Sequence, residues 1–442
     1  MAAISKQLSL LLCLLLGFCA CIPVSTNGPE ERKMMVQPDT IPSGIQTLGL
    51  ATDTLYDKIL GALVGSAIGD ALGAPTEMWN RYNRAVEFGY VDSLTRSTRP
   101  PSPEASWAYG LPLGATTDDT RWKLLTVDFM VNNLPDFYQL NGPDPRDFSK
   151  YIIDAYQAEV QALKATEGTN PQDFEDNMML MAWLQEWAQV AYAFTEGDIE
   201  KYTYALHKFY GGELVCAGML YAPAMALAFP GHPHQAYQAA YRLSIFDQGY
   251  ARDITGLTAA MTAAALAPNA QPSQVMAVFR DIDPNDYFRT RLFGRASFNT
   301  YQEARYIVDQ AKRIDKIQPQ GLDILPEVDS LVATRMIAAY KALDERNQHS
   351  PAHAQEILLI SLVAMLYADF DFQLALAFLT NYGRDNDTTG AVVGAILGAY
   401  HGFNALPKSM KAQVLITNKE KLGIDLEHLA RTLLGAMEKE LQ

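Results

Sequence analysis

The chain has 442 residues, of which 49% are hydrophobic and 19% are charged, a composition that excludes an intrinsically disordered protein. Its formal net charge of -15 makes the surface as a whole a poor match for nucleic acid or anionic lipid. An anionic substrate would need a local cation, which a cluster of carboxylates could recruit as a bound metal ion.

The first 21 residues have the pattern of an export signal. Lys6 precedes an apolar run from Leu8 to Phe18, and small residues follow. The run is too short for a membrane span, which takes about 20 apolar residues, and no later stretch qualifies as one. The end of this leader resembles a bacterial lipoprotein signal, so we predict lipid attachment at Cys21, with Cys19 as the alternative. The protein would then sit in the bacterial periplasm or at the cell surface, held to the membrane only by this lipid; simple cleavage and secretion is the other outcome.

The rest of the chain divides into a short linker and one long helical domain. Residues 22–54 are rich in Pro, Ser, Thr and charge, lack apolar periodicity and predict a flexible linker. Over 55–442, helix-favouring residues predominate and alternating β-branched runs are scarce, which predicts a single all-α domain. Outside the leader only Cys216 remains, so no internal disulfide is expected, and its side chain should be a small buried hydrophobe. Helices are expected at 57–71, 120–132, 174–194, 215–228, 255–266 and 355–366, and loops at 99–103 and 141–145.

The first chemically distinctive motif is GALVGSAIGDALGAPTE, residues 61–77. Its early glycines recur at every fourth position, so they would form one bare stripe along a helix where another helix or a ligand can approach. These are Gly61, Gly65 and Gly69. Gly73 and Pro75 should end this helix and place Glu77 on a loop.

The second motif is GATTDDT, residues 114–120. Adjacent aspartates within a helix point about 100° apart, so Asp118 and Asp119 could not both serve one site there. In the turn that opens a helix, both can bend toward one point, and the helix N-terminus stabilises their charge. Capping is the commoner use of such residues, and TDDT alone favours that simpler interpretation.

The third motif is GRDNDTTGAVVGAILGAYHG, residues 383–402, which again joins an acidic turn to a glycine stripe. Asp385 and Asp387 are two residues apart and can face the same way, and Thr388 adds a hydroxyl. Together with the second motif this gives four carboxylates and two hydroxyls. Such a hard-oxygen ligand set suits magnesium, with manganese or calcium as alternatives.

In their order and spacing, the three motifs resemble those of the ADP-ribosylglycohydrolase family, specifically the dinitrogenase-reductase-activating type of glycohydrolase. The resemblance implies a single large orthogonal helical bundle over 55–442 with two bound magnesium ions, for which manganese could substitute. It places Glu77 beside the scissile bond, and Glu77 and Asp119 are the candidate catalytic residues. Asp70 is expected to be structural or to support the ligands. The implied metal ligands are Thr117, Asp118, Asp119, Asp385, Asp387 and Thr388.

The middle of the chain matches this family less well. In GGELVCAGMLYAPAMAL, residues 211–227, the glycines Gly211 and Gly212 correspond to a loop that contacts the ribose and phosphates of the substrate, but the following residues depart from the commoner pattern. Trp107 and Tyr109 are aromatic candidates for stacking on an adenine. The aglycone and the anomer therefore stay open.

The resemblance implies a hydrolase, a magnesium-dependent glycosidase that cleaves the ribosyl C1 bond of ADP-ribosylated or related ribosylated substrates. Glu77 would act as general acid or base, or as a gate. One alternative is a non-catalytic surface lipoprotein that binds a nucleotide-like ligand, although the intact ligand set argues against it. The other is a hydrolase of another ribosylated compound or a nucleoside. We expect a monomer whose partner is a small-molecule or ADP-ribosylated substrate and not nucleic acid.

Overall fold

The computed structural model describes residues 51–96, 110–166, 168, 171–319, 325 and 330–440, apart from the side chains of 171–177, 179 and 180. The export signal with Cys19 and Cys21, nearly all of the linker, the loop at 99–103, and Trp107 and Tyr109 lie outside the described residues. The expectations for them stay predictions.

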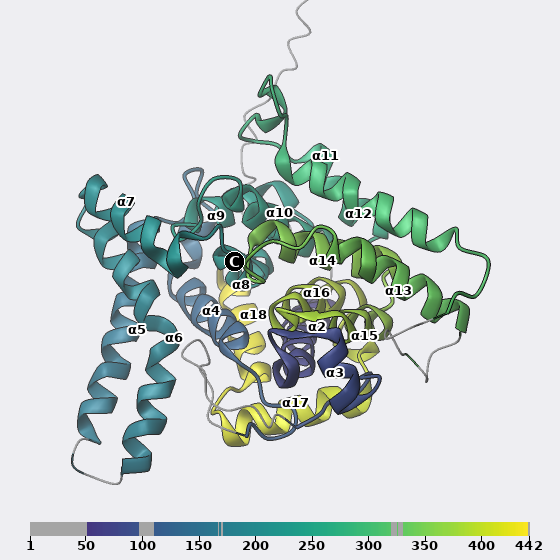
Figure 1. The fold of residues 1–442 in the computed structure, drawn as a ribbon. Coiled ribbons are helices and arrows are strands. Elements are labelled where there is room, and N and C mark those ends of the chain that lie inside the picture. Colours follow the sequence, from purple (N-terminus) through teal and green to yellow (C-terminus); the bar gives the residue numbers. More distant parts are fainter. Residues whose placement is uncertain are drawn as a thin grey trace, which may run out of the picture. The chain divides into compact units, whose positions relative to one another are not determined.

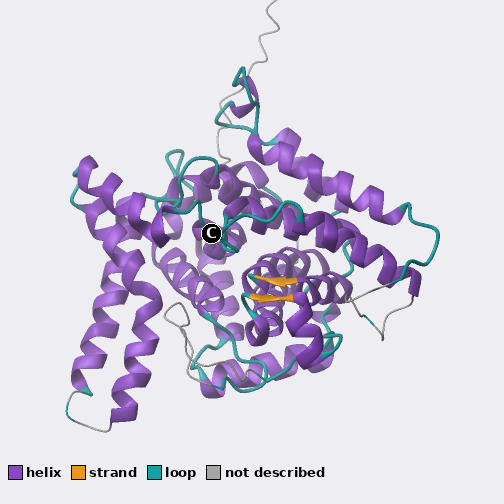
Figure 2. Cartoon of the chain, in the orientation of Figure 1, coloured by secondary structure: helices purple, strands orange, loops and turns teal. Residues whose placement is uncertain are grey.

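The described part is built from helices and a single two-stranded sheet, which confirms the expected all-α class (Figures 1 and 2). The helices are α2 (Thr52–Gly73), α3 (Arg81–Phe88), α4 (Asp118–Phe137), α5 (Pro145–Ala165), α6 (Pro171–Thr195), α7 (Ile199–Lys208), α8 (Ala217–Met225), α9 (Pro233–Leu243), α10 (Ala251–Ala265), α11 (Pro272–Asp281), α12 (Ala296–Lys312), α13 (Ser330–Asp344), α14 (Ala354–Tyr367), α15 (Phe372–Tyr382), α16 (Asn386–His401), α17 (Lys408–Lys421) and α18 (Leu426–Glu440). Short 3₁₀ turns are η1 (Ala74–Thr76), η2 (Phe209–Gly212), η3 (Ala226–Ala228), η4 (Tyr287–Arg289) and η5 (Phe403–Ala405), and the strands are β1 (Trp79–Asn80) and β2 (Gly383–Arg384).

All six expected helices are present, but their ends differ from the expectation. α4 begins at Asp118, so both aspartates of the second motif lie in the first helical turn, with Thr117 as the N-cap. The segment expected at 215–228 is α8 followed by the 3₁₀ turn η3. α2 begins at Thr52, inside the segment expected to be linker.

α2 is also the one described helix whose length and hydropathy would suffice to cross a membrane. The qualifying segment is Thr52–Thr76, so the expectation that no stretch after the leader meets this criterion is wrong. Its whole apolar window is buried inside the described fold, as in the core helix of a globular domain.

The centre of the fold is the contact between α2 and α16, which lie side by side in Figure 1. A Cβ atom on Gly69 would lie 1.9 Å from the backbone oxygen of Gly390, and one on Gly65 would lie 2.3 Å from that of Gly394. Ordinary Cβ contacts are longer than 3.0 Å, so these positions accept only glycine at this helix separation. The glycine stripes therefore serve helix packing, one of the two uses the sequence allowed.

This packing sets the place of the acidic motifs. The two helices run antiparallel, since Gly61 meets Gly398 and Gly69 meets Gly390, and a Cβ on Gly73 would lie 2.2 Å from the backbone nitrogen of Asp387. The end of α2 therefore meets the beginning of α16. The sheet in Figure 2 reinforces this junction, because Trp79 pairs with Arg384 and the amide of Met78 donates to the Arg384 carbonyl at 2.7 Å.

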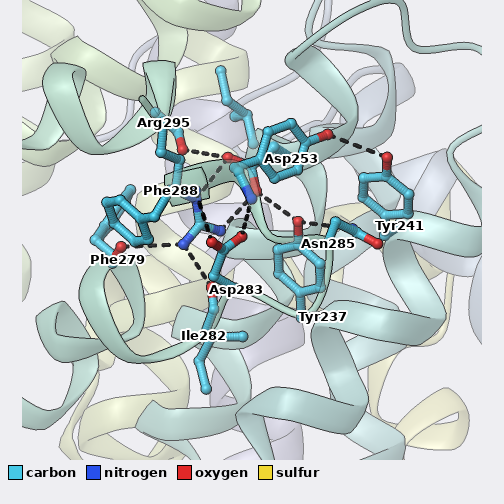
Figure 3. A network of polar contacts seen from close by, with 12 residues as sticks. Tyr237, Tyr241, Asp253, Phe279, Ile282, Asp283, Asn285, Phe288 and Arg295 are labelled. Carbon is cyan, nitrogen blue, oxygen red and sulfur yellow. Dashed lines mark hydrogen bonds and ion pairs between the residues drawn. The ribbon is translucent and has the colours of Figure 1, made fainter. Parts of the chain in front are cut away.

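A polar network around the buried pair Arg295 and Asp253 joins further helices (Figure 3). Arg295 donates to both carboxylate oxygens of Asp253, at 2.7 and 2.9 Å, and its side chain is 0% exposed. It also donates to the Phe279 and Ile282 carbonyls at the end of α11, and Tyr237 donates to Asp253 from α9. Because the charges are paired and hydrogen-bonded, the network fixes α9, α10, α11 and the beginning of α12 relative to one another.

Lys58 gives the core a testable pH dependence. Its ammonium group donates to the carbonyls of Ala265, Ala399 and Tyr400 at 3.0, 2.9 and 3.2 Å, at the last turns of α10 and α16. A helix C-terminus favours a cation. Burial nevertheless lowers the pKa of Lys58 to about 8 from its ordinary 10.5.

We expect Lys58→Met to lower the free energy of unfolding by about 3 kcal/mol at pH 7, because two buried carbonyls and one part-buried carbonyl lose their donor. Between pH 8 and 10.5 the unfolded chain holds the proton that the folded protein has lost, so stability of the wild type relative to Lys58→Met should rise with pH. Urea unfolding of both proteins at pH 7 and pH 10 measures this difference. Parallel stability curves across that window would contradict it.

Candidate metal centre

Three carboxylates, one of them far from the other two in the sequence, meet where the end of α2 contacts the beginning of α16. Glu77 follows η1, Asp385 is the N-cap of α16 and Asp387 lies in its first turn. One oxygen from each lies within 4.8 Å of the others, and all three side chains are buried. Nothing in the local sequence brings Glu77 to this point; the glycine packing and the short sheet do.

Asp118 and Asp119 line the same cavity from the first turn of α4. The cavity has a volume of about 780 Å³, and Thr388 also lines it. The Thr388 hydroxyl donates to Asp119 at 3.0 Å, so a hydrogen bond links the second and third motifs directly. The structure thus brings together five of the predicted carboxylates and one hydroxyl, although Asp118 and Asp119 stand outside the closest group of three.

Asp70 explains how α4 is held against α2. Its buried carboxylate accepts hydrogen bonds from the backbone nitrogens of Thr117 and Thr120, at 3.0 to 3.1 Å, and from both of their hydroxyls, at 3.0 and 2.6 Å. These donors belong to the N-terminus of α4, which otherwise has amides without partners. Asp70 therefore caps the N-terminus of α4 from a different helix, and a role in supporting the metal ligands stays a prediction.

Thr117 is the predicted ligand that the geometry supports least. Its hydroxyl donates to Asp70 and accepts from the Asp119 amide at 3.4 Å, which is the capping use, and it is not among the residues that line the cavity. Its role as a metal ligand stays a prediction.

Burial and mutual repulsion raise the pKa values of the carboxylates, so a bound cation would stabilise their ionised forms. Burial, followed by the charges of Glu77 and Asp119, raises the pKa of Asp385 to about 8. Burial and then Glu77 and Asp385 raise the pKa of Asp387 well above its usual range. Like charges in a desolvated place cannot all ionise without compensation. A divalent cation among them would remove much of that penalty.

The donor chemistry fits a hard metal ion. The ligand candidates are all oxygens, and Asp119 has a buried oxygen, Oδ1, without a hydrogen-bond partner, 3.7 Å from the ammonium group of Lys123. Oxygen ligands of this kind suit magnesium, manganese or calcium. Cys216 also lines the cavity, but burial and then Asp385 raise the pKa of its thiol well above normal, which makes it a poor ligand. The buried position expected for Cys216 is confirmed.

The remaining cavity wall was only partly predicted. Gly211 lines it, as expected for a substrate-contacting residue, whereas Gly212 is not among the lining residues. Three aromatic residues complete this side, with the Trp187 indole donating to the Tyr210 hydroxyl at 3.3 Å. These are Trp183, Trp187 and Tyr210. These aromatic residues were not predicted from the sequence. The feature that could have pointed to them is the pair of tryptophans four residues apart on the expected helix at 174–194.

Comparison with known proteins identifies one family. The family model described as ADP-ribosylglycohydrolase matches residues 51–441. "Uncharacterized protein YegU" of Escherichia coli strain K12 is 36% identical over 75 residues, a match that spans 17% of this chain and only 21% of that relative. A solved structure titled "ADP-ribosylglycohydrolase-related protein complex" is 20% identical, with a TM-score of 0.48 over 87% of this chain and 99% of the other.

Proposed function

Since the chain belongs to the ADP-ribosylglycohydrolase family and is thus a hydrolase of that superfamily, we propose that it cleaves the ribosyl C1 bond of an ADP-ribosylated or related ribosylated substrate with two bound magnesium ions. One observation carries the proposal: Glu77, Asp385 and Asp387 converge within 4.8 Å inside a cavity that Asp118 and Asp119 also line. The cavity volume of about 780 Å³ is in the range of small-molecule sites.

The residues that would hold the ions are Asp118, Asp119, Asp385, Asp387 and Thr388, with Thr117 as the further predicted ligand. When bound, magnesium would supply positive charge that orients the ribose hydroxyls and offsets charge at the reacting atoms. The Thr388–Asp119 hydrogen bond supports this, because it joins a hydroxyl from one half of the ligand set to a carboxylate from the other half.

Glu77 is the residue that we propose for the proton transfer. Cleavage of a ribosyl C1 bond develops oxocarbenium character, so a leaving atom needs a proton and an attacking water must lose one. Glu77 follows the end of η1, and its side chain faces the cavity from a loop and is only 9% exposed. A carboxyl group there could move a proton at the leaving atom or at the water, while the aromatic wall excludes bulk water.

We expect chelation to abolish turnover and magnesium or manganese to restore it, because carboxylate and hydroxyl oxygens are ligands that suit these hard ions, and we expect zinc to support turnover poorly. The assay offers ADP-ribosyl-arginine, ADP-ribosyl-serine, O-acetyl-ADP-ribose and simple nucleosides to the purified protein, with and without excess chelator. Release of the aglycone from at least one of them in magnesium supports the proposal. Full turnover in excess chelator, with no metal found by elemental analysis, would contradict the metal centre.

The same panel separates the remaining substrate classes. Cleavage of nucleosides alone would favour a hydrolase of another ribosylated compound, and cleavage of an ADP-ribosyl substrate would favour the family's eponymous reaction. Binding of ADP-ribose without cleavage of any compound would favour the non-catalytic ligand-binding protein.

A further inference from the structure

Arg384, the residue before Asp385, has an unusual backbone conformation. Its φ angle is +65°, in the left-handed region that disfavours residues with a Cβ atom. Such a conformation persists only where the surroundings enforce it. Part of the constraint is the short sheet, in which Arg384 pairs with Trp79 and its carbonyl accepts from Met78.

The side chain of Arg384 supplies the other part of the constraint. Its Nε donates to Glu356 Oε1 at 2.7 Å, and its Nη2 donates to Glu356 Oε2 at 3.0 Å and to the Gln348 carbonyl at 3.0 Å. The Glu356 side chain is only 2% exposed, and it also accepts from the Gln348 amide at 2.5 Å. A two-point pair of this kind fixes direction as well as distance.

Glu356 and Gln348 bracket a segment that forms part of the cavity wall. Residues 347–353 are the last part of the connection from α13 to α14, and Ser350, Pro351 and Ala352 line the same cavity as the carboxylates. The Ala352 carbonyl accepts from the Cys216 amide at 3.0 Å, so the segment also orders the wall that carries Cys216. Neither Arg384 nor Glu356 lines the cavity itself.

We propose that Arg384 and Glu356 are positioning residues that hold the 347–353 wall at a fixed distance from Asp385 and thereby set the affinity for substrate. The pair joins the strand that leads into the metal ligands to the 347–353 part of the cavity wall, and its two residues are 28 positions apart in the sequence. A lysine would keep the charge but lose the planar fork that makes the two contacts. The structural part of this inference stands without the proposed function; only its kinetic part rests on it.

The test compares four variants with the wild type: Arg384→Gly, Glu356→Gln, the double variant that combines these two changes, and a control. Arg384→Gly removes the guanidinium and leaves a residue suited to the left-handed backbone, so the turn itself should survive. Glu356→Gln neutralises the partner at nearly the same size. The matched control is Lys312→Met, which removes another ion pair, Lys312–Asp369 at 2.7 Å, whose two residues line no part of this cavity.

Hydrogen exchange reports the position of the wall directly. In Arg384→Gly and Glu356→Gln we expect exchange to rise about tenfold at the amides of Gln348, His353, Ala354 and Cys216, which are hydrogen-bonded within or beside the segment. Lys312→Met should leave these amides unchanged. Unchanged exchange in Arg384→Gly would overturn the proposal.

Kinetics report the consequence for the site. With a substrate from the panel, KM should rise about tenfold while kcat changes less than about threefold, and the double variant should match the single ones because the two residues act as one unit. Raised exchange with unchanged KM would overturn the role in affinity. If the wild type cleaves no compound, the proposed function fails, and the calorimetric affinity for ADP-ribose then replaces KM: an unchanged affinity in Arg384→Gly overturns this inference, and a loss supports it.

Discussion

Replacing Asp387 with alanine is expected to weaken metal binding at least about 100-fold and to remove most of the turnover. Its carboxylate is 2% exposed and lies in the closest group of the centre, with Glu77 and Asp385. Alanine keeps the helical turn of α16, so the change removes the ligand and little else. Calorimetric titration with magnesium and manganese, together with the turnover assay, measures both effects.

Thermal unfolding without metal shows whether the loss comes from misfolding. Burial and the charges of Glu77 and Asp385 raise the pKa of Asp387, so ionising it in the folded protein costs stability at neutral pH. Asp387→Ala should therefore unfold at the same temperature as the wild type or at a higher one when metal is absent. A variant that binds metal and turns over normally would remove Asp387 from the centre.

Glu77→Gln is the matched comparison, because it keeps size and hydrogen-bonding capacity but cannot exchange a proton. We expect it to retain metal and ligand while the rate falls about 10²- to 10⁴-fold. Normal turnover in Glu77→Gln beside a dead Asp387→Ala would make the glutamate a gate or a packing residue. If turnover is absent throughout and Asp387→Ala abolishes ligand binding, the ligand-binding protein is the correct interpretation.

Gly69→Ala should destabilise the fold by about 3 kcal/mol or more, because the new methyl group would lie 1.9 Å from the backbone oxygen of Gly390. That oxygen is part of a helix and cannot rotate away, so α2 and α16 must separate. Separation would also draw Asp387 away from Glu77. Urea unfolding measures the stability, and metal titration of the folded variant measures the second effect.

Gly435 offers the control for this change. It lies within α18, and a Cβ atom there would meet nothing within 4 Å. Gly435→Ala should therefore stabilise the protein by up to about 1 kcal/mol through the better helix propensity of alanine. Equal stability of Gly69→Ala and the wild type would contradict the close approach of the two helices.

The glycine and aspartate motifs predict the core of the fold because each can be interpreted from a short stretch of sequence. A four-residue glycine period indicates a helix face that another helix or a ligand can approach closely, and two such stripes in one chain can pack against each other. The acidic residues at the beginnings of α4 and α16 can be recognised in the same way, from the few residues around them. The sequence leaves two roles open for Asp70. It does not decide between them, because the four groups that donate hydrogen bonds to Asp70 lie at the N-terminus of α4, whose N-cap Thr117 is 47 residues later in the chain.

Most of the remaining cavity wall, apart from Gly211, could not be predicted from the sequence, for a physical reason. Trp183 and Trp187 lie four residues apart on a helix. This spacing is the same for tryptophans that fill a core, which is their usual role, and for tryptophans that line a cavity. Residues 350–352 carry no chemical signature, and the hydrogen bonds that hold them beside the site come from other elements, among them the one from the Cys216 amide to the Ala352 carbonyl. Such placements depend on contacts between elements and not on the pattern within any one of them.

The pairing of α2 with α16 has a consequence for how the chain is made. Lys58 and its acceptor Ala399 are 341 residues apart, so α2 emerges from the ribosome long before its partner. At about 5 to 20 residues per second, the interval is roughly 20 to 70 s, during which a helix that is apolar on every side lacks α16, its main packing partner. Folding of the core must therefore follow synthesis of almost the whole chain. Until then, α2 is the segment that would bind chaperones or else aggregate.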